Sequence, residues 1–245
     1  MDAKLVPVIA NKKTLVDIEM LRRCSMLFSV LSDEDANAII QLGCIVEHPA
    51  KHMVFQVGEA GDQLLILLEG RVKVSLNSAD GKEAILSILE PGNVMGEMAL
   101  IDGDTRSANV TTMEACSFLV LWRRDFLPFL ERNPHVALKL LSGLSLRLRA
   151  TNNMVGNLSF LNLPARLARI LINLGQQYGK VTDKGIAIGL KLSQEELGNL
   201  VGVSRESVNR QIRLWVEASV LDYSHGTIIL KNSDALFRES LNSDR

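Results

Sequence analysis

Three charged side chains near the C-terminal end of the sequence, Arg205, Glu206 and Arg210, could read the edges of DNA bases. Arginine can donate two hydrogen bonds to guanine O6 and N7, and a carboxylate can accept one from cytosine N4. Charged side chains on an arbitrary helix are most often only solvated. The DNA hypothesis therefore depends on the residues that precede and position these three.

The preceding residues carry a closely spaced set of helix-capping signals. Ser193 and Glu196 have the spacing of a capping box, which predicts that a helix begins there. Gly202 permits the left-handed backbone of a tight turn, and Ser204 is then placed to cap a second helix. The pattern predicts a helix-turn-helix whose second helix presents its first two turns to the major groove. The coincidence of these signals favours DNA binding over a solvated surface helix.

A second group of residues could bind a sugar phosphate. Residues 96–100 can start a short helix whose free N–H groups and dipole favour an anion, and Arg106 supplies a fork of donors suited to a phosphate. Glu97 would repel a phosphate unless it accepts a hydrogen bond from a nearby hydroxyl, and a sugar phosphate supplies both groups. The alternative is a surface turn with an Arg–Glu ion pair.

Short strands with alternating apolar and polar residues, joined by turns that contain glycine, are predicted over about residues 25–132. This pattern is typical of a small barrel or jelly roll. The runs at 72–76 and 108–110 are examples, and Asp80-Gly81 is a hairpin signal between two such runs. The glycines at turn-like positions are Gly58, Gly61, Gly70, Gly81, Gly92, Gly96 and Gly103.

A long helix is predicted from Pro134 onward, because apolar residues recur with the alternating spacing of a heptad seam. The seam consists of Ala137, Leu141, Leu144, Leu148, Thr151, Val155 and Leu158. Such a seam indicates a helix that pairs with a second helix along its length. The alternative is a helix packed on its own domain, but the polar Thr151 on the seam favours a dimer because a polar seam residue usually sets register.

The remaining segments complete a winged helix. The Gly-rich stretch at 181–190 is predicted to form strand, and a short β-prone run follows the two helices at Thr227–Leu230. The first 24 residues are helix-prone and otherwise uninformative.

The amino-acid composition limits the classes of protein to which the chain can belong. With 245 residues, 47% of them hydrophobic and 22% charged, the chain has the balance of a globular protein with one or two domains. Its apolar runs at 64–68 and 118–122 are much shorter than the ~20 residues of a membrane helix, so we expect a cytoplasmic protein. Cys24, Cys44 and Cys116 lack metal-ligand spacing and are expected to be reduced thiols. Residues 163–245 hold 11 Lys/Arg against 9 Asp/Glu, a balance in the direction expected for a DNA-binding segment.

Two motifs together resemble those of the cyclic AMP receptor protein–FNR family of bacterial regulators: Gly96-Glu97-x-Ala99-Leu100 with Arg106-Ser107-Ala108, and Val203-Ser204-Arg205-Glu206-Ser207-Val208. The resemblance extends over about residues 25 to 235 and implies an α+β fold. Its expected parts are an N-terminal extension (1–24), a cyclic-nucleotide-binding β-roll or jelly roll (25–133), a dimerisation helix (134–162) and a C-terminal winged helix-turn-helix domain (163–245).

The resemblance also implies residue roles. Arg106 and Ser107 would bind the cyclic phosphate, and Gly96 and Glu97 the ribose 2′-hydroxyl. Thr151 would contact the base from one subunit and Asn152 from the other, although the family's type member has serine at the position of Asn152. The expected ligand-binding set is Gly96, Glu97, Met98, Ala99, Arg106, Ser107, Thr151 and Asn152, and the expected DNA-binding set is Ser193, Gln194, Ser204, Arg205, Glu206, Asn209 and Arg210.

We therefore expect a cyclic-AMP-responsive transcription regulator that binds, as a homodimer, a palindrome with GTGA-like half-sites, with cyclic AMP as allosteric effector and RNA polymerase as a further partner. Within the family, cyclic GMP, cyclic di-GMP or no ligand at all are alternatives. The alternative from another class is a cyclic-nucleotide regulatory module of an enzyme or channel, but the helix-turn-helix argues against it. The sequence has no Ser/His/Asp set and no phosphate-binding loop of the P-loop kind, so we do not expect an enzyme. It also has no metal-ligand spacing, no oxygen-sensing cysteine cluster and no recognisable pair of haem ligands, so we expect no metal site. A membrane role is not expected either.

Overall fold

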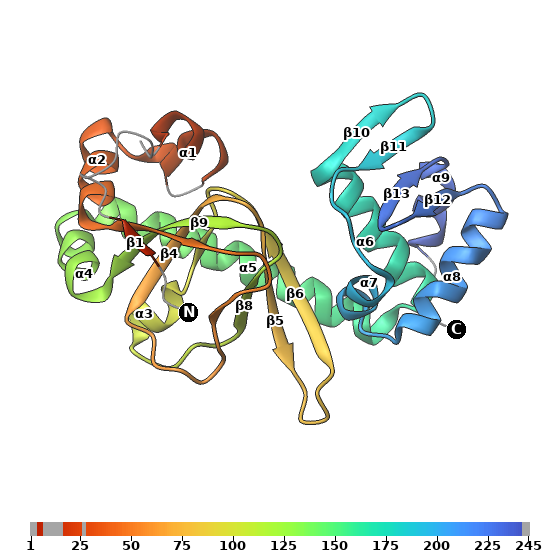
Figure 1. Cartoon of the computed structure of the whole chain (residues 1–245), viewed down its shortest axis with the longest axis horizontal. Coiled ribbons are helices and arrows are strands. Elements are labelled where there is room, and N and C mark those ends of the chain that lie inside the picture. Colours follow the sequence, from red (N-terminus) through yellow and green to blue (C-terminus); the bar gives the residue numbers. More distant parts are fainter. Residues whose placement is uncertain (1–3, 7–16, 26–27, 242–245) are drawn as a thin grey trace. The chain divides into compact units, whose positions relative to one another are not determined.

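The computed structural model describes residues 4–6, 17–25 and 28–241. The chain divides into two compact units, Met1–Leu76 with Leu86–Leu148, and Asn77–Ile85 with Arg149–Arg245 (Figure 1). The first unit is built from β-sheet and the second from helices around a small sheet, so the predicted α+β fold class is confirmed.

Two antiparallel sheets form the roll. One has the strand order β1-β2-β9-β4-β7 and the other β3-β8-β5-β6. The strands are β1 (Lys4–Val6), β2 (Cys44–His48), β3 (Met53–Phe55), β4 (Gln63–Glu69), β5 (Val72–Asn77), β6 (Glu83–Leu89), β7 (Val94–Met95), β8 (Asn109–Thr112) and β9 (Cys116–Trp122). The strand at Lys4–Val6 pairs with β2, so the expectation that the first 24 residues are helix-prone is wrong there.

The unbroken apolar run of β4 reflects burial on both faces of its strand. Leu64, Ile66 and Leu68 pack against the helices of the first unit, whereas Leu65 and Leu67 face the second sheet. Successive side chains of a strand point to opposite faces, so both sets of positions must be apolar. The central strand β9 alternates in the same way.

The turn between β5 and β6 contains the Asp80-Gly81 signal, as the sequence predicted. Gly81 has φ +82°, which a residue with a side chain adopts only at a cost. The amide N–H of Ser78 donates to the carbonyl of Lys82 at 2.8 Å and closes the turn.

Five α-helices and one 3-10 turn accompany the roll in the described residues. They are α1 (Ile18–Cys24), η1 (Phe28–Val30), α2 (Asp33–Leu42), α3 (Glu97–Asp102), α4 (Arg123–Arg132) and α5 (Pro134–Phe160). The long helix begins at Pro134, as predicted, and has two apolar faces. Val136 and Leu140 are buried in the core of the roll, whereas Leu141, Leu148, Val155 and Leu158 of the seam are 43–63% exposed.

In the described residues, the second unit contains a four-stranded sheet of order β10-β11-β13-β12, the C-terminal turns of α5 and four further helices. Its elements are α6 (Leu163–Tyr178), β10 (Gly179–Thr182), β11 (Gly185–Ile188), α7 (Gln194–Val201), α8 (Arg205–Glu217), β12 (Leu221–Ser224), β13 (Thr227–Leu230) and α9 (Ser233–Glu239). The stretch predicted as strand at 181–190 is a hairpin that begins at Gly179 and ends at Ile188. Strand β12 and helix α9 were not predicted.

Candidate functional site

The predicted sugar-phosphate segment forms a tight corner between β7 and β8. Helix α3 begins after Gly96 and ends at Gly103, and both glycines have left-handed backbones, with φ +82° and +78°. A Cβ on Gly96 would also lie 2.5 Å from Nη1 of Arg106. Glycine is therefore required at position 96 both by the backbone and by the side chain that packs against it.

Arg106 is the cation of this corner. It is only 6% exposed, its Nη1 donates to the carbonyl of Gly96 at 3.1 Å, and its guanidinium lies 3.7 Å from the ring centroid of Phe55. Burial lowers the pKa of Arg106, and the carboxylates of Asp62, Glu59 and Glu97 oppose that shift. Arginine remains charged throughout the usual pH range. In the part of the chain that the structure describes, Arg106 forms no ion pair within 4 Å, so a buried cation is available to an anion.

Glu97 is the matching acceptor. Its side chain is 5% exposed, and Oε1 accepts a 2.5 Å hydrogen bond from Nη1 of Arg147 on α5. The other terminal nitrogen of Arg147 donates to the carbonyl of Val94. Oε2 of Glu97 is buried and has no hydrogen-bond partner among the described residues. A buried carboxylate oxygen without a donor is costly, and a hydroxyl of a bound molecule would supply that donor.

The structure brings six of the eight expected ligand residues together. Met98 is 47% exposed and Ala99 is buried, and the hydroxyl of Ser107 lies 3.7 Å from the sulfur of Met98. These two residues and Ser107 lie in the same corner as Gly96, Glu97 and Arg106. Thr151 and Asn152 are exposed on α5, within the portion of the helix that belongs to the second unit.

Three residues of the corner were not predicted as site residues from the sequence: Phe55, Gly61 and Arg147. A Cβ on Gly61 would meet Ala99 at 2.5 Å and Arg106 at 2.9 Å, so this glycine makes room for the guanidinium. The spacing of Arg147 from Leu140, one seven-residue repeat, is a signal that it faces the roll. No local pattern could have connected Phe55 with Arg106.

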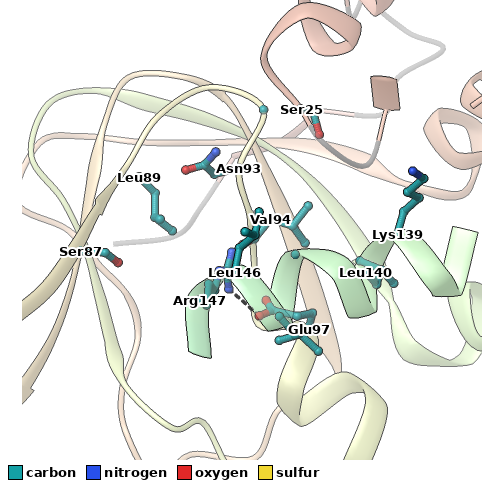
Figure 2. Close-up of a pocket in the computed structure, with 13 residues that line it drawn as sticks. Ser25, Ser87, Leu89, Asn93, Val94, Glu97, Lys139, Leu140, Leu146 and Arg147 are labelled. Atoms are coloured by element: carbon teal, nitrogen blue, oxygen red, sulfur yellow. Dashed lines mark hydrogen bonds and ion pairs between the residues drawn. The ribbon is translucent and has the colours of Figure 1, made fainter. Parts of the chain in front are cut away.

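A cavity of about 250 Å³ lies between β6, the 92–94 segment and α5 (Figure 2). Glu97 and Arg147 form part of its lining, and Figure 2 shows the dashed contact between them. Neither Arg106 nor Ser107 lines it.

The helix-turn-helix is built as the capping signals predicted. Ser193 Oγ accepts from the amide of Glu196 at 3.1 Å, and Glu196 Oε2 accepts from the amide of Ser193 at 2.8 Å. Gly202 ends α7 with φ +78°, and Ser204 caps α8. Glycine is also required at position 198, which the capping signals did not predict, because a Cβ there would lie 2.7 Å from the carbonyl oxygen of Val203.

Helix α8 buries one face and exposes the other. Val208, Ile212 and Trp215 are buried, whereas Arg205, Glu206 and Arg210 are exposed. Hydrogen bonds from its own amide and from the Ser204 hydroxyl, with the charge of Arg205, lower the pKa of Glu206. Glu206 is therefore ionised near neutral pH and can only accept hydrogen bonds there. Ser193 is exposed, and Gln194 and Asn209 are half-buried at the N-terminal parts of α7 and α8.

Two family models match the chain: the cyclic nucleotide-binding domain over residues 45–133 and the Crp-like helix-turn-helix domain over residues 165–239. The chain is 31% identical over 195 residues to the CRP-like cAMP-activated global transcriptional regulator of Mycobacterium tuberculosis. The aligned residues cover 80% of this chain and 87% of that protein. The chain belongs to the CRP/FNR family of transcription regulators. It is also 33% identical to the cAMP-activated global transcriptional regulator CRP of Salmonella typhimurium, over 76% of this chain and 88% of that one.

Solved structures of CRP/FNR-type regulators share the fold. The c-di-GMP responsive regulator CLP of Xanthomonas campestris matches with a TM-score of 0.74 at 24% identity, over 81% of this chain and 99% of that one. A CooA mutant from Carboxydothermus hydrogenoformans matches with a TM-score of 0.75 at 21% identity, over 88% of this chain and 95% of that one.

The family membership confirms the coarse functional prediction. The chain is a ligand-responsive, DNA-binding transcription regulator with a cyclic nucleotide as effector, and its relatives are regulators and not enzymes. Among the helices that the structure describes, none has the length and apolarity to cross a bilayer.

Proposed function

We propose that this CRP/FNR regulator responds to cyclic AMP. The observation that carries the proposal is the pairing of two buried groups. Arg106 forms no ion pair with a described carboxylate, and Oε2 of Glu97 has no hydrogen-bond partner among the described residues. A cyclic phosphate fused to a ribose presents an anion and a 2′-hydroxyl donor on one rigid unit. Gly96, Met98, Ala99 and Ser107 would surround that unit, and Thr151 and Asn152 would contact the base.

Cyclic GMP and cyclic di-GMP present the same two chemical groups, and a structurally similar regulator is described as c-di-GMP responsive. Calorimetric titration of the full chain with cyclic AMP, cyclic GMP and cyclic di-GMP separates these effectors. Cyclic AMP is expected to bind at least tenfold more tightly than the other two, about 1.4 kcal/mol. A tighter second nucleotide, or no heat with any of the three, would reject cyclic AMP as the effector.

We further propose that the regulator acts as a homodimer on a palindromic operator with GTGA-like half-sites and contacts RNA polymerase there. The exposed apolar residues of the seam support the dimer; they are Leu141, Leu148, Val155 and Leu158. The exposed arginines of α8 suit guanines, and ionised Glu206 suits a cytosine on the opposite strand. Ser193, Gln194, Ser204 and Asn209 would contribute contacts at the helix N-termini.

Ligand and DNA binding are expected to be coupled, because Thr151 and Asn152 lie on the helix that leads through Asn162 and Pro164 into α6. Ligand contact would favour a separation of ~34 Å between the two recognition helices, one turn of DNA. Operator affinity should rise by about 1–3 kcal/mol with cyclic AMP, and operator DNA should tighten cyclic AMP binding by the same factor. Fluorescence anisotropy and calorimetry measure the two sides. Identical operator affinity with and without every nucleotide would contradict the coupling.

Arg210→Ala is expected to cost ~1–3 kcal/mol on the operator, about 5- to 150-fold, and to relax discrimination at one base pair. The reason is that a bidentate arginine contact specifies guanine, whereas a contact to a phosphate does not depend on the base sequence. Selection from random duplexes with the wild type and the variant measures the change. Arg238→Ala removes an exposed arginine from α9 and is the control, with the same consensus expected. If the variant lost affinity equally whatever the base at each operator position, Arg210 would contact the phosphate backbone and would not read a base.

A further inference from the structure

The end of the β4–β9 strand pair, where β9 passes into α4, brings charges of both signs together (Figure 1). Gln63 pairs with Trp122 at the last position of this antiparallel ladder. The residues just beyond that pair are Asp62 and Arg123, and the amide of Arg123 donates to the carbonyl of Asp62 at 2.7 Å. Arg124 is the next residue of α4. A carboxylate and two guanidiniums therefore start from adjacent stretches of backbone.

These charges do not neutralise one another within the chain. Among the residues that the structure describes, the carboxylate of Asp62 forms no hydrogen bond and no ion pair within 4 Å. Arg124 pairs with its neighbour Asp125 at 3.4 Å, but its side chain is 80% exposed, and such a surface pair contributes little. Arg123 donates from Nη2 to the carbonyl of Ile101 at 3.5 Å, and its buried Nε has no partner in the described part of the chain. An acceptor and several donors are left for a bound molecule.

A cavity of about 450 Å³ is lined by these charged groups and by an apolar wall. Its lining consists of Asp62, Trp122, Arg123, Arg124, Leu127 and Pro128. The indole N–H of Trp122 also has no hydrogen-bond partner among the described residues. None of the residues proposed to bind the nucleotide lines this cavity. The cavity therefore offers both signs of charge beside apolar surface, at a place separate from the phosphate contacts.

We propose that this cavity binds a zwitterionic α-amino acid with an apolar side chain. The carboxylate lies at the guanidiniums of Arg123 and Arg124, and the ammonium lies at Asp62. The side chain lies against Trp122 and Leu127. A simple organic anion would meet the carboxylate of Asp62 and a simple cation would meet the two arginines, and like charges repel. A zwitterion avoids both conflicts.

The size of the cavity fits such a ligand. An apolar cavity of about 150 Å³ takes benzene, so one of about 450 Å³ has room for a phenyl ring and the two charged groups of an amino acid. Aromatic rings pack well against one another, and Trp122 supplies such a ring in the wall. Phenylalanine is therefore a suitable probe of the site.

The first test titrates the full chain with L-phenylalanine and two analogues that keep the phenyl ring. Hydrocinnamate lacks the ammonium, and phenethylamine lacks the carboxylate. Ligand-detected NMR measures the dissociation constants. L-phenylalanine is expected to bind on the order of tenfold more tightly than either analogue, because each charge-assisted hydrogen bond adds to the apolar contact. No binding of L-phenylalanine, or an analogue that binds as tightly, would overturn the proposal.

The second test removes one charge at a time from exposed side chains of the lining. Asp62→Asn should abolish the advantage of L-phenylalanine over hydrocinnamate and keep its advantage over phenethylamine. Arg124→Gln should do the reverse, lowering the advantage over phenethylamine and keeping the advantage over hydrocinnamate. Arg132→Ala removes an exposed arginine of α4 outside the cavity and should leave all the affinities unchanged. Unchanged preferences in both lining variants, or the same loss against both analogues in each, would overturn the proposal.

A third measurement separates this site from the nucleotide corner. Burial lowers the pKa of Arg106 and the charge of Asp62 opposes that shift, so the two sites share an electrostatic interaction. Arg106→Ala should bind L-phenylalanine at least as tightly as the wild type, because it removes a positive charge that competes for Asp62. This holds whether or not cyclic AMP proves to be the effector. If Arg106→Ala loses L-phenylalanine, the probe occupies the nucleotide corner and the cavity is not its site.

Discussion

Arg106→Ala is expected to weaken cyclic AMP binding by about 2–5 kcal/mol, which is at least roughly thirtyfold. Arg106 is 6% exposed and forms no ion pair with a described carboxylate, so an incoming phosphate would acquire its main counter-charge from this one side chain. Removing it would leave the phosphate desolvated and unpaired. Calorimetric titration of wild type and variant measures the loss directly.

Three controls separate binding from folding in this experiment. Arg106 also contacts Phe55 and the carbonyl of Gly96, so thermal unfolding of the variant must be measured alongside. Arg106→Lys keeps the charge and loses the planar fork, and its affinity should fall between those of wild type and the alanine variant. Arg132→Ala removes an exposed arginine from α4 and should leave binding unchanged. A folded alanine variant with wild-type affinity would contradict the role of Arg106.

The helix-turn-helix was predictable because its signals are local. Each cap joins residues three apart, as Ser193–Glu196 and Ser204–Ser207 do in the structure. A local pattern needs no knowledge of the rest of the fold. The same reasoning could have found α9, because Asn232 accepts from the amide of Ala235 in the same kind of cap.

The missed parts of the candidate site depend on contacts between distant residues. Arg147 and Glu97 are 50 residues apart, and Phe55 on β3 contacts Arg106 in the loop before β8. The strand at Lys4–Val6 likewise exists through its pairing with β2. Such contacts follow from strand order and helix docking, which a spacing rule does not contain. The sequence could therefore predict the loop that carries Glu97 and Arg106 but not the groups that orient them.

Leu148→Asp is expected to convert a dimer into a monomer. Leu148 belongs to the predicted seam and is 63% exposed, so its substitution should not disturb the packing within one chain. In a parallel pair of helices, equivalent seam residues face one another, and two facing carboxylates in an apolar interface cannot both ionise without a large penalty. An uncompensated buried charge costs about 3–5 kcal/mol, so the dimer should weaken at least about hundredfold.

Sedimentation equilibrium at micromolar concentration, with and without cyclic AMP, measures the dimer, and the wild type should be dimeric in both conditions. Leu146→Asp is the matched control, because Leu146 is an equally large side chain on the same helix, 51% exposed and off the seam. That variant should remain dimeric. Since a palindromic operator requires two recognition helices, Leu148→Asp should also lose most of its operator affinity while keeping its circular dichroism spectrum. A monomeric wild type, or a Leu148→Asp dimer as stable as that of Leu146→Asp, would show that α5 does not pair along this seam.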